Sequence, residues 1–228
     1  MLQNIRIAVD AVVFGYQHGE LYVLLIKQKF GTEEAYWALP GGLVLNDEAL
    51  IDAVKRELKE ETNVEVNYLE QLYTFGDDIN RDSRNRVISV AYFVLIDSSK
   101  TLIKADTDAD NVQWFAIKEV PQLAFDHKLI LNTALARLKA KLTYQPIGFD
   151  LLPEEFLFSE LENLYCTILE KEIDRRNFRK KILSFGIVEE TDRFSEKKGG
   201  RPAKFFKFNK KKYKQLDKEG FHFEIRFA

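Results

Sequence analysis

Three glutamates and an arginine in one short segment have the types and spacing for metal-dependent chemistry. Glu57, Glu60 and Glu61 stand at i, i+3 and i+4, directly after Arg56. On a helix these positions share one face, so the three carboxylates would gather there and repel one another. A hard cation such as Mg²⁺ or Mn²⁺, which prefers oxygen ligands, would relieve that repulsion. The spacing therefore predicts a divalent-metal site, with solvated surface acids as the alternative.

The surrounding residues resemble the Nudix box, a glycine, a glutamate and an Arg-Glu helix at fixed spacing. Eight positions match in register: Gly42, Glu48, Arg56, Glu57, Leu58, Glu60, Glu61 and Val64. The departure is Asn63, where the pattern has glycine. That glycine ends the helix in a left-handed conformation, and Asn is the next residue best able to adopt it. We therefore expect the helix cap to be preserved.

The resemblance implies roles for the box residues. Glu57, Glu60 and Glu61 would hold Mg²⁺ or Mn²⁺ and position a water for attack on a nucleoside diphosphate derivative. Glu57 and Glu61 remain alternatives for the general base. Gly42, Glu48 and Arg56 would support the box, the last two through an ion pair.

The elements that must position the box are those of a mixed sheet with a helix on each face. Branched residues predict two strands at 5–14 and 21–27, joined by a turn at 15–20. Apolar spacing predicts a helix over 48–62, with Asp47 as its N-cap. Further strands are predicted at 64–75, 87–96 and 112–116, and a further helix near 130–142.

The pattern changes around residues 143–148, which predicts a domain boundary between 1–145 and 146–228. Beyond it, a capping box at 159–162 opens a helix to about Lys171. A strongly basic helix follows at 174–184, with Phe178, Ile182 and Leu183 as its buried stripe; strands at 187–191 and 203–208 flank a glycine-bearing tip. This succession is typical of a winged helix-turn-helix.

Charge is distributed unevenly along the chain. The formal net charge is -2, yet residues 171–218 carry 17 basic and 7 acidic side chains. Lys and Arg neutralise phosphates, and a helix fits the major groove of DNA. We therefore predict double-stranded DNA as a partner, with a solvated helix and a flexible loop as the alternative. The predicted DNA contacts are Arg175, Arg176, Asn177, Arg179, Lys180, Lys197, Lys198 and Arg201.

Together the two halves resemble the Nudix-related transcriptional regulators. Beyond the box, the resemblance rests on the segments 124–127, 176–180 and 200–203. It implies an α+β protein: a Nudix α/β/α sandwich with a mixed sheet, then a winged helix-turn-helix. Members are homodimers that bind pseudo-palindromic operators. Their Nudix domain senses an effector, ADP-ribose in one branch and arabinose in another.

Several residues are predicted to contact that effector. The aromatic rings of Trp37, Phe75 and Phe125 could stack on a base or sugar, with burial in the core as the alternative. Asp126 and His127 belong to the family signature.

Two functions remain open from the sequence. The first is a transcriptional regulator whose Nudix domain senses ADP-ribose or a related nucleotide or sugar, with hydrolysis of that ligand as an added option. The second is a Mg²⁺-dependent hydrolase of ADP-ribose or similar compounds without a regulatory role, since every acidic position of the box is intact. A single cysteine and the lack of a long apolar run predict a cytoplasmic protein without membrane association.

Overall fold

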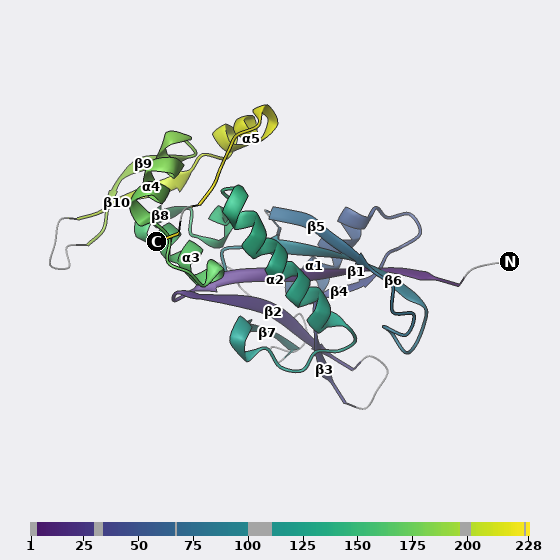
Figure 1. Ribbon diagram of the computed structural model, residues 1–228. Helices are drawn as coiled ribbons and strands as arrows, with labels where there is room; N and C mark the ends of the chain where they lie inside the picture. The colour runs from purple at the N-terminus through teal and green to yellow at the C-terminus, as the bar shows by residue number, and fades with distance from the viewer. Residues whose placement is uncertain (1–3, 30–33, 67, 100–110, 197–201, 226) are drawn as a thin grey trace. The chain divides into compact units, whose positions relative to one another are not determined.

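The computed structural model describes residues 4–29, 34–66, 68–99, 111–196, 202–225 and 227–228 (Figure 1). The chain forms two compact units, one from Met1–Gln17 with Leu21–Arg137 and the other from His18–Glu20 with Leu138–Ala228. The division falls inside helix α2 (His127–Tyr144), whereas the predicted boundary after residue 145 lies just beyond the end of that helix.

The first unit is built on a mixed sheet, as predicted. Its central strands β1 and β6 are parallel, while β4 with β1, β3 and β7 with β2, and β5 with β6 pair antiparallel. The strand order is β3-β2-β1-β6-β5, with β4 paired to β1 and β7 paired to β2. The strands are β1 (Arg6–Gln17), β2 (Glu20–Gln28), β3 (Tyr36–Ala38), β4 (Gly41–Leu43), β5 (Tyr68–Phe75), β6 (Val87–Leu95) and β7 (Val112–Ala116).

Both faces of the central strands are covered. Side chains alternate along β1. Val9 and Ala11 pack in a core with helix α1 (Leu50–Thr62), while Asp10 on the other side of the strand contacts His127 at the start of α2. The apolar residues Ala53, Val54 and Leu58 of α1 are buried in this core, and Leu50 is partly buried against it. A short 3₁₀ turn, η2 (Ile117–Glu119), follows β7.

Two local predictions about the N-terminal strands and α1 are wrong. The turn between β1 and β2 involves only His18 and Gly19, whose φ angles of 50° and 82° are both positive. A two-residue turn of this kind matches the twist of paired strands, so both strands extend further than predicted. Helix α1 begins at Leu50 with Ala49 as its N-cap, so Asp47 does not cap it.

The expectation for Asn63 is confirmed. Asn63 is the C-cap of α1 with φ 56° and ψ 19°, and its backbone N–H bonds to the carbonyl of Lys59. Asparagine therefore ends the helix in the left-handed conformation that the pattern assigns to glycine.

The second unit is a winged helix, as predicted. Helices α3 and α4 precede a hairpin, and the small sheet has the order β8-β10-β9. Strand β8 and helix α5 were not predicted. The elements are η3 (Phe149–Leu151), β8 (Glu155–Leu157), α3 (Phe158–Leu169), α4 (Arg175–Ser184), β9 (Val188–Phe194), β10 (Lys204–Phe208) and α5 (Lys210–Glu219).

Two details of this unit differ from the sequence prediction. The capping box at 159–162 is displaced, because α3 starts at Phe158 and the carboxylate of Glu160 accepts the Leu157 backbone N–H at 2.7 Å. In α4, Phe178 and Ile182 are buried, but Leu183 is 40% exposed and is not part of the buried stripe. Within the described residues, no helix has both the length and the apolar character needed to cross a membrane.

Candidate functional site

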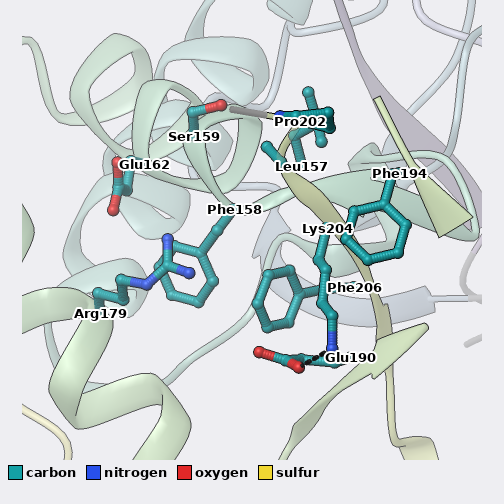
Figure 2. A pocket seen from close by; sticks show the side chains of 11 residues that line it. Leu157, Phe158, Ser159, Glu162, Arg179, Glu190, Phe194, Pro202, Lys204 and Phe206 are labelled. Atoms are coloured by element: carbon teal, nitrogen blue, oxygen red, sulfur yellow. Dashed lines mark hydrogen bonds and ion pairs between the residues drawn. The ribbon is translucent and has the colours of Figure 1, made fainter. Parts of the chain in front are cut away.

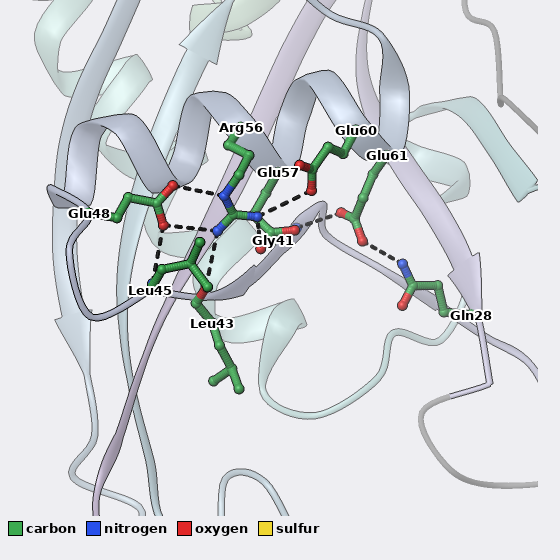
Figure 3. Close-up of polar contacts among 9 residues, drawn as sticks. All are labelled: Gln28, Gly41, Leu43, Leu45, Glu48, Arg56, Glu57, Glu60 and Glu61. Carbon is green, nitrogen blue, oxygen red and sulfur yellow. Dashed lines mark hydrogen bonds and ion pairs between the residues drawn. The ribbon is translucent and has the colours of Figure 1, made fainter.

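Arg56 forms ion pairs with three glutamates of the Nudix box, Glu48, Glu57 and Glu60 (Figure 3). Its Nε and Nη2 donate to both carboxylate oxygens of Glu48 at 2.8 and 2.9 Å, so the ion pair expected between these residues is present. Its Nη1 also donates to Glu57 at 2.8 Å and to Glu60 at 3.2 Å. The hydrogen bonds that Arg56 donates to Glu48, followed by the one it donates to Glu57, raise the pKa of Arg56. The bonds from Arg56 also lower the pKa of Glu48. Arg56 thus fastens α1 to the loop before it.

Glu61 has a different environment. Its carboxylate turns away from Arg56 and accepts hydrogen bonds from the backbone N–H of Gly41 at 2.8 Å and from the side chain of Gln28. Burial raises the pKa of Glu61 to about 7, and the charges of Glu57 and Asp10 act in the same direction. No cation among the described residues is paired with this carboxylate. A bound cation would therefore be stabilised here.

Two glycines allow the loop to approach these acids closely. A Cβ on Gly42 would lie 2.3 Å from Oε1 of Glu57, and a Cβ on Gly41 would lie 2.2 Å from the carbonyl oxygen of Val9. Such distances are far below van der Waals contact. Glycine at position 42 therefore lets Glu57 lie against the loop, and glycine at position 41 lets the loop lie against β1 at Val9 and Asp10.

The donor types fit a divalent cation, but the carboxylates are not gathered around one point. Within the described part of the chain, no group of three or more His, Cys, Asp and Glu side chains is arranged to hold a metal ion. Glu57 and Glu60 are engaged by Arg56, and the side chain of Glu60 is 60% exposed. A metal ion would compete with Arg56 for Glu57 and Glu60, while Glu61 is free of that competition.

A second cluster, which the sequence did not reveal, lies next to the box. Arg81 donates to both oxygens of Asp126 at 2.9 and 2.6 Å and to Asp10 at 3.4 Å, and its side chain is only 4% exposed. Burial alone would lower the pKa of Arg81, but the bonds and charges of Asp126 and Asp10 outweigh it and raise that pKa. Asp10 pairs in register with Gly41, so the cluster adjoins the loop that Glu61 contacts.

His127 completes this cluster. Its Nδ1 accepts the backbone N–H of Leu39 at 2.9 Å, so the ring proton is on Nε2, which faces Asp10 at 3.5 Å. Burial lowers the pKa of His127, and the neighbouring acids only partly oppose this. Ser89 donates to the same carboxylate, Asp10. One sequence signal was available for Asp10: an acid inside a run of apolar strand residues needs a buried partner.

The predicted effector residues occupy different environments. Asp126 and His127 lie in the cluster just described, and Phe125 stacks with the guanidinium of Arg84 at 5.0 Å. Trp37 is half-buried and meets the ring of Phe115 edge-on at 4.7 Å. Phe75 is 7% exposed, which favours the core interpretation for that residue.

In the second unit, the structure separates the predicted DNA contacts on α4. Arg175 is engaged by Glu162 at 3.6 Å and by the side-chain oxygen of Asn163 at 3.0 Å. The amide of Asn177 bonds to Asp174, the residue that caps α4. The exposed side chains of Arg176 and Lys180 have no partner among the described residues, and their i, i+4 spacing places them on one face.

Arg179 points into a pocket beside the hairpin of β9 and β10, which forms the wing of this unit (Figure 2). Its guanidinium lies 4.4 Å from the ring centre of Phe158 and 5.4 Å from that of Phe206. These residues line a pocket of about 570 Å³ whose rim also carries the ion pair of Lys204 and Glu190. Lys197, Lys198 and Arg201, predicted for the wing tip, lie outside the described residues.

Comparisons with known proteins agree with both units. The family model of the NUDIX domain matches residues 4–136, and that of the NrtR DNA-binding winged helix domain matches residues 148–208. The chain is 35% identical over 204 residues to the ADPR responsive transcriptional repressor NtrR of Acinetobacter baylyi, covering 88% of this chain and 80% of that protein. It is 36% identical over 128 residues to the ADP-ribose pyrophosphatase of Methanocaldococcus jannaschii, covering 55% of this chain and 70% of that enzyme.

Solved structures of related proteins are similar to this chain over nearly its whole length. NrtR of Shewanella oneidensis complexed with a 27mer DNA matches with a TM-score of 0.83 and 29% identity, covering 96% of this chain and 98% of that one. The NUDIX domain of the same protein complexed with ADP ribose matches with a TM-score of 0.53 and 33% identity, covering 60% and 90%. The chain therefore belongs to the NrtR family of Nudix-related transcriptional regulators, in which a NUDIX domain is followed by a DNA-binding winged helix.

Proposed function

We propose that this protein is a transcriptional repressor whose Nudix unit binds ADP-ribose and whose winged helix binds a double-stranded DNA operator. The observation that carries the proposal is the pair of unpartnered cations, Arg176 and Lys180, on the second helix of a winged-helix unit. Residues 1–145 form the effector domain and residues 146–228 the DNA-binding domain. Such a protein acts as a homodimer in the cytoplasm, where each winged helix meets one half-site of the operator.

We assign different roles to the polar residues of α4. Arg176 and Lys180 contact phosphates or base edges, because no described residue neutralises either charge. Arg175 and Asn177 fix the start of α4 through Glu162 and Asp174. Arg179 stabilises the wing by stacking on its aromatic residues, and the wing-tip residues Lys197, Lys198 and Arg201 remain proposed backbone contacts.

ADP-ribose is the proposed effector because both the box and its neighbourhood suit a diphosphate with an attached nucleoside. Members of the Nudix family generally use a divalent metal, and Mg²⁺ or Mn²⁺ held by Glu57, Glu60 and Glu61 would neutralise the diphosphate. Glu61 contributes a half-buried carboxylate that no cation among the described residues engages. The ring of Phe125, with Arg84 beside it, offers a face on which a base or ribose can stack.

DNA binding by the full-length protein tests the proposal. We expect it to bind a duplex from its own upstream region more tightly than a scrambled duplex at moderate salt, and ADP-ribose to weaken that binding. The double variant Arg176→Ala/Lys180→Ala should lose affinity by roughly 30-fold or more, since each of the two contacts contributes about 1–3 kcal/mol. Arg175→Ala serves as the matched control with a smaller effect. Equal affinity of the wild type for both duplexes would reject the proposal.

A second activity is favoured by the intact acids of the box and by the similarity to an ADP-ribose pyrophosphatase. If the box turns over, a water attacks one phosphorus of ADP-ribose, and AMP and ribose 5-phosphate leave. Glu57 or Glu61 would accept the proton of that water. Release of AMP in Mg²⁺, abolished by Glu60→Gln or Glu61→Gln, would establish the activity; no turnover over a panel of nucleoside diphosphate derivatives would exclude it.

A further inference from the structure

We infer that helix α5 provides a second DNA-contacting surface, through the three residues Lys211, Lys214 and Lys218, termed the lysine stripe. The helix follows the wing strand β10 directly (Figure 1) and lies beyond residue 208, where the match to the family's winged helix ends. The inference rests on the proposed function, because it assumes that the winged-helix unit binds DNA.

The lysine stripe is the exposed face of a helix whose adjacent face is anchored to the unit. Lys210, Tyr213 and Asp217 make the anchoring contacts. Lys210 pairs with Asp150 at 3.1 Å, and Tyr213 and Asp217 accept hydrogen bonds from Gln145 at 2.9 and 3.2 Å. Each member of the stripe is one residue further along the chain and is exposed. One residue corresponds to about 100° of rotation, so the stripe points away from those contacts.

The cations of this unit fall into two groups. The two lysines of the wing strand β10 are neutralised, because Lys204 pairs with Glu190 at 2.7 Å and Lys207 pairs with Glu189 at 3.6 Å. In contrast, no described residue pairs with any member of the lysine stripe, and the same holds for Arg176 and Lys180 on α4. The unpaired positive charge of the described winged-helix unit is therefore concentrated on α4 and α5.

The dimensions of the stripe suit a phosphate backbone. Its seven-residue span on a helix corresponds to about 10 Å along the axis. Over that length one DNA strand presents roughly three phosphates. Lysine bonds phosphates as a flexible point charge and does not select bases. We therefore assign the stripe to sequence-independent contact with the backbone of DNA beside the half-site that α4 occupies.

The test is the salt dependence of DNA binding by the full-length protein. The probes are a duplex from the gene's own upstream region and a scrambled duplex of equal length. Changing the whole lysine stripe to glutamine should lower the slope of log K against log[salt] by up to about 2.7, or about 0.9 for each phosphate that the variant no longer neutralises. The DNA affinity of the wild type would then fall up to about 40-fold more than that of the variant between 50 and 200 mM salt. Both duplexes should be affected equally.

Two control variants make the result specific. Glutamine at Lys55, Lys118 and Lys128 removes the same charge from exposed positions of the Nudix unit and should leave the slope unchanged. Arginine at the three stripe positions keeps the charge and should retain the wild-type slope. Far-ultraviolet circular dichroism and thermal unfolding establish that each variant is folded.

The outcomes separate this inference from the proposed function. If the wild type prefers its upstream duplex but the glutamine variant keeps the wild-type slope, the lysine stripe is only a solvated surface. Loss of affinity for the upstream duplex alone would also overturn the inference, because a backbone contact weakens both duplexes. If the wild type binds neither duplex at 50 mM salt, the proposed function itself fails.

Discussion

Replacing Arg81 with alanine should destabilise the Nudix unit strongly. Arg81 is the cation between two acids, bonded to Asp126 through two hydrogen bonds and to Asp10 through one. The exposed fractions of these three side chains are 4%, 17% and 9%. Without the guanidinium, both carboxylates would remain in a poorly solvated site without their shared cation.

The expected cost follows from this burial. Breaking a buried ion pair by removing one partner costs about 3–5 kcal/mol. A domain has about 5–15 kcal/mol of stability, so the loss is a large fraction of the total. For a protein of this size the melting temperature should fall by roughly 6–20 °C. The double variant Arg81→Ala/Asp126→Asn should recover part of the loss, because it removes one of the two unpaired charges.

Urea or guanidinium unfolding of the full-length protein measures the effect. The matched control is Arg86→Ala in the same loop, because among the described residues Arg86 donates to the backbone carbonyls of Gly76 and Asp78 and to no carboxylate. We expect that control to cost about 1 kcal/mol. If Arg81→Ala costs no more than Arg86→Ala, or if Asp126→Asn gives no compensation, the assignment of Arg81 as the central cation is refuted.

Three further predictions concern the box and its surroundings. Gly42→Ala would place a Cβ 2.3 Å from the carboxylate of Glu57. The variant should therefore lose about 1–3 kcal/mol of unfolding free energy and show less thermal stabilisation by Mg²⁺. An unchanged response to Mg²⁺ would count against this packing. Asn63→Ala should destabilise the protein by about 1 kcal/mol, because alanine adopts the left-handed conformation of this cap less readily. Asn63→Gly should be neutral or stabilising. Urea unfolding measures both variants, and equal stability of the two would contradict the left-handed cap. The pKa of His127 is lower in the folded protein than the ordinary value of about 6.5 in the unfolded chain. As the pH falls through that value, the unfolded chain binds a proton at His127 before the native state does. The free energy of unfolding therefore decreases as the pH falls. NMR titration should place the midpoint of the His127 ring below the ordinary value of about 6.5, and a midpoint at or above that value would refute its burial.

Local sequence was sufficient to predict the Nudix helix and its cap. The spacing of apolar residues along α1 gives its buried face, and the left-handed ending follows from the preference of Asn63 for that conformation. The winged helix was predictable for a similar reason, since α3, α4 and the hairpin strands each have their own period of apolar residues. Short elements such as β8, with only three residues, carry too few positions to show a period.

The tertiary structure decided which charges are paired. Arg81 is 45 residues from Asp126 and 71 from Asp10 in the sequence, so no local pattern could connect them. Likewise, Arg175 and Arg176 are neighbours in the sequence, yet only Arg175 meets an acid of α3. Sequence determines which groups can ionise and which face of an element is apolar. Only folding determines which charges lose their water and find a partner, because pairing depends on distances between elements that are far apart along the chain.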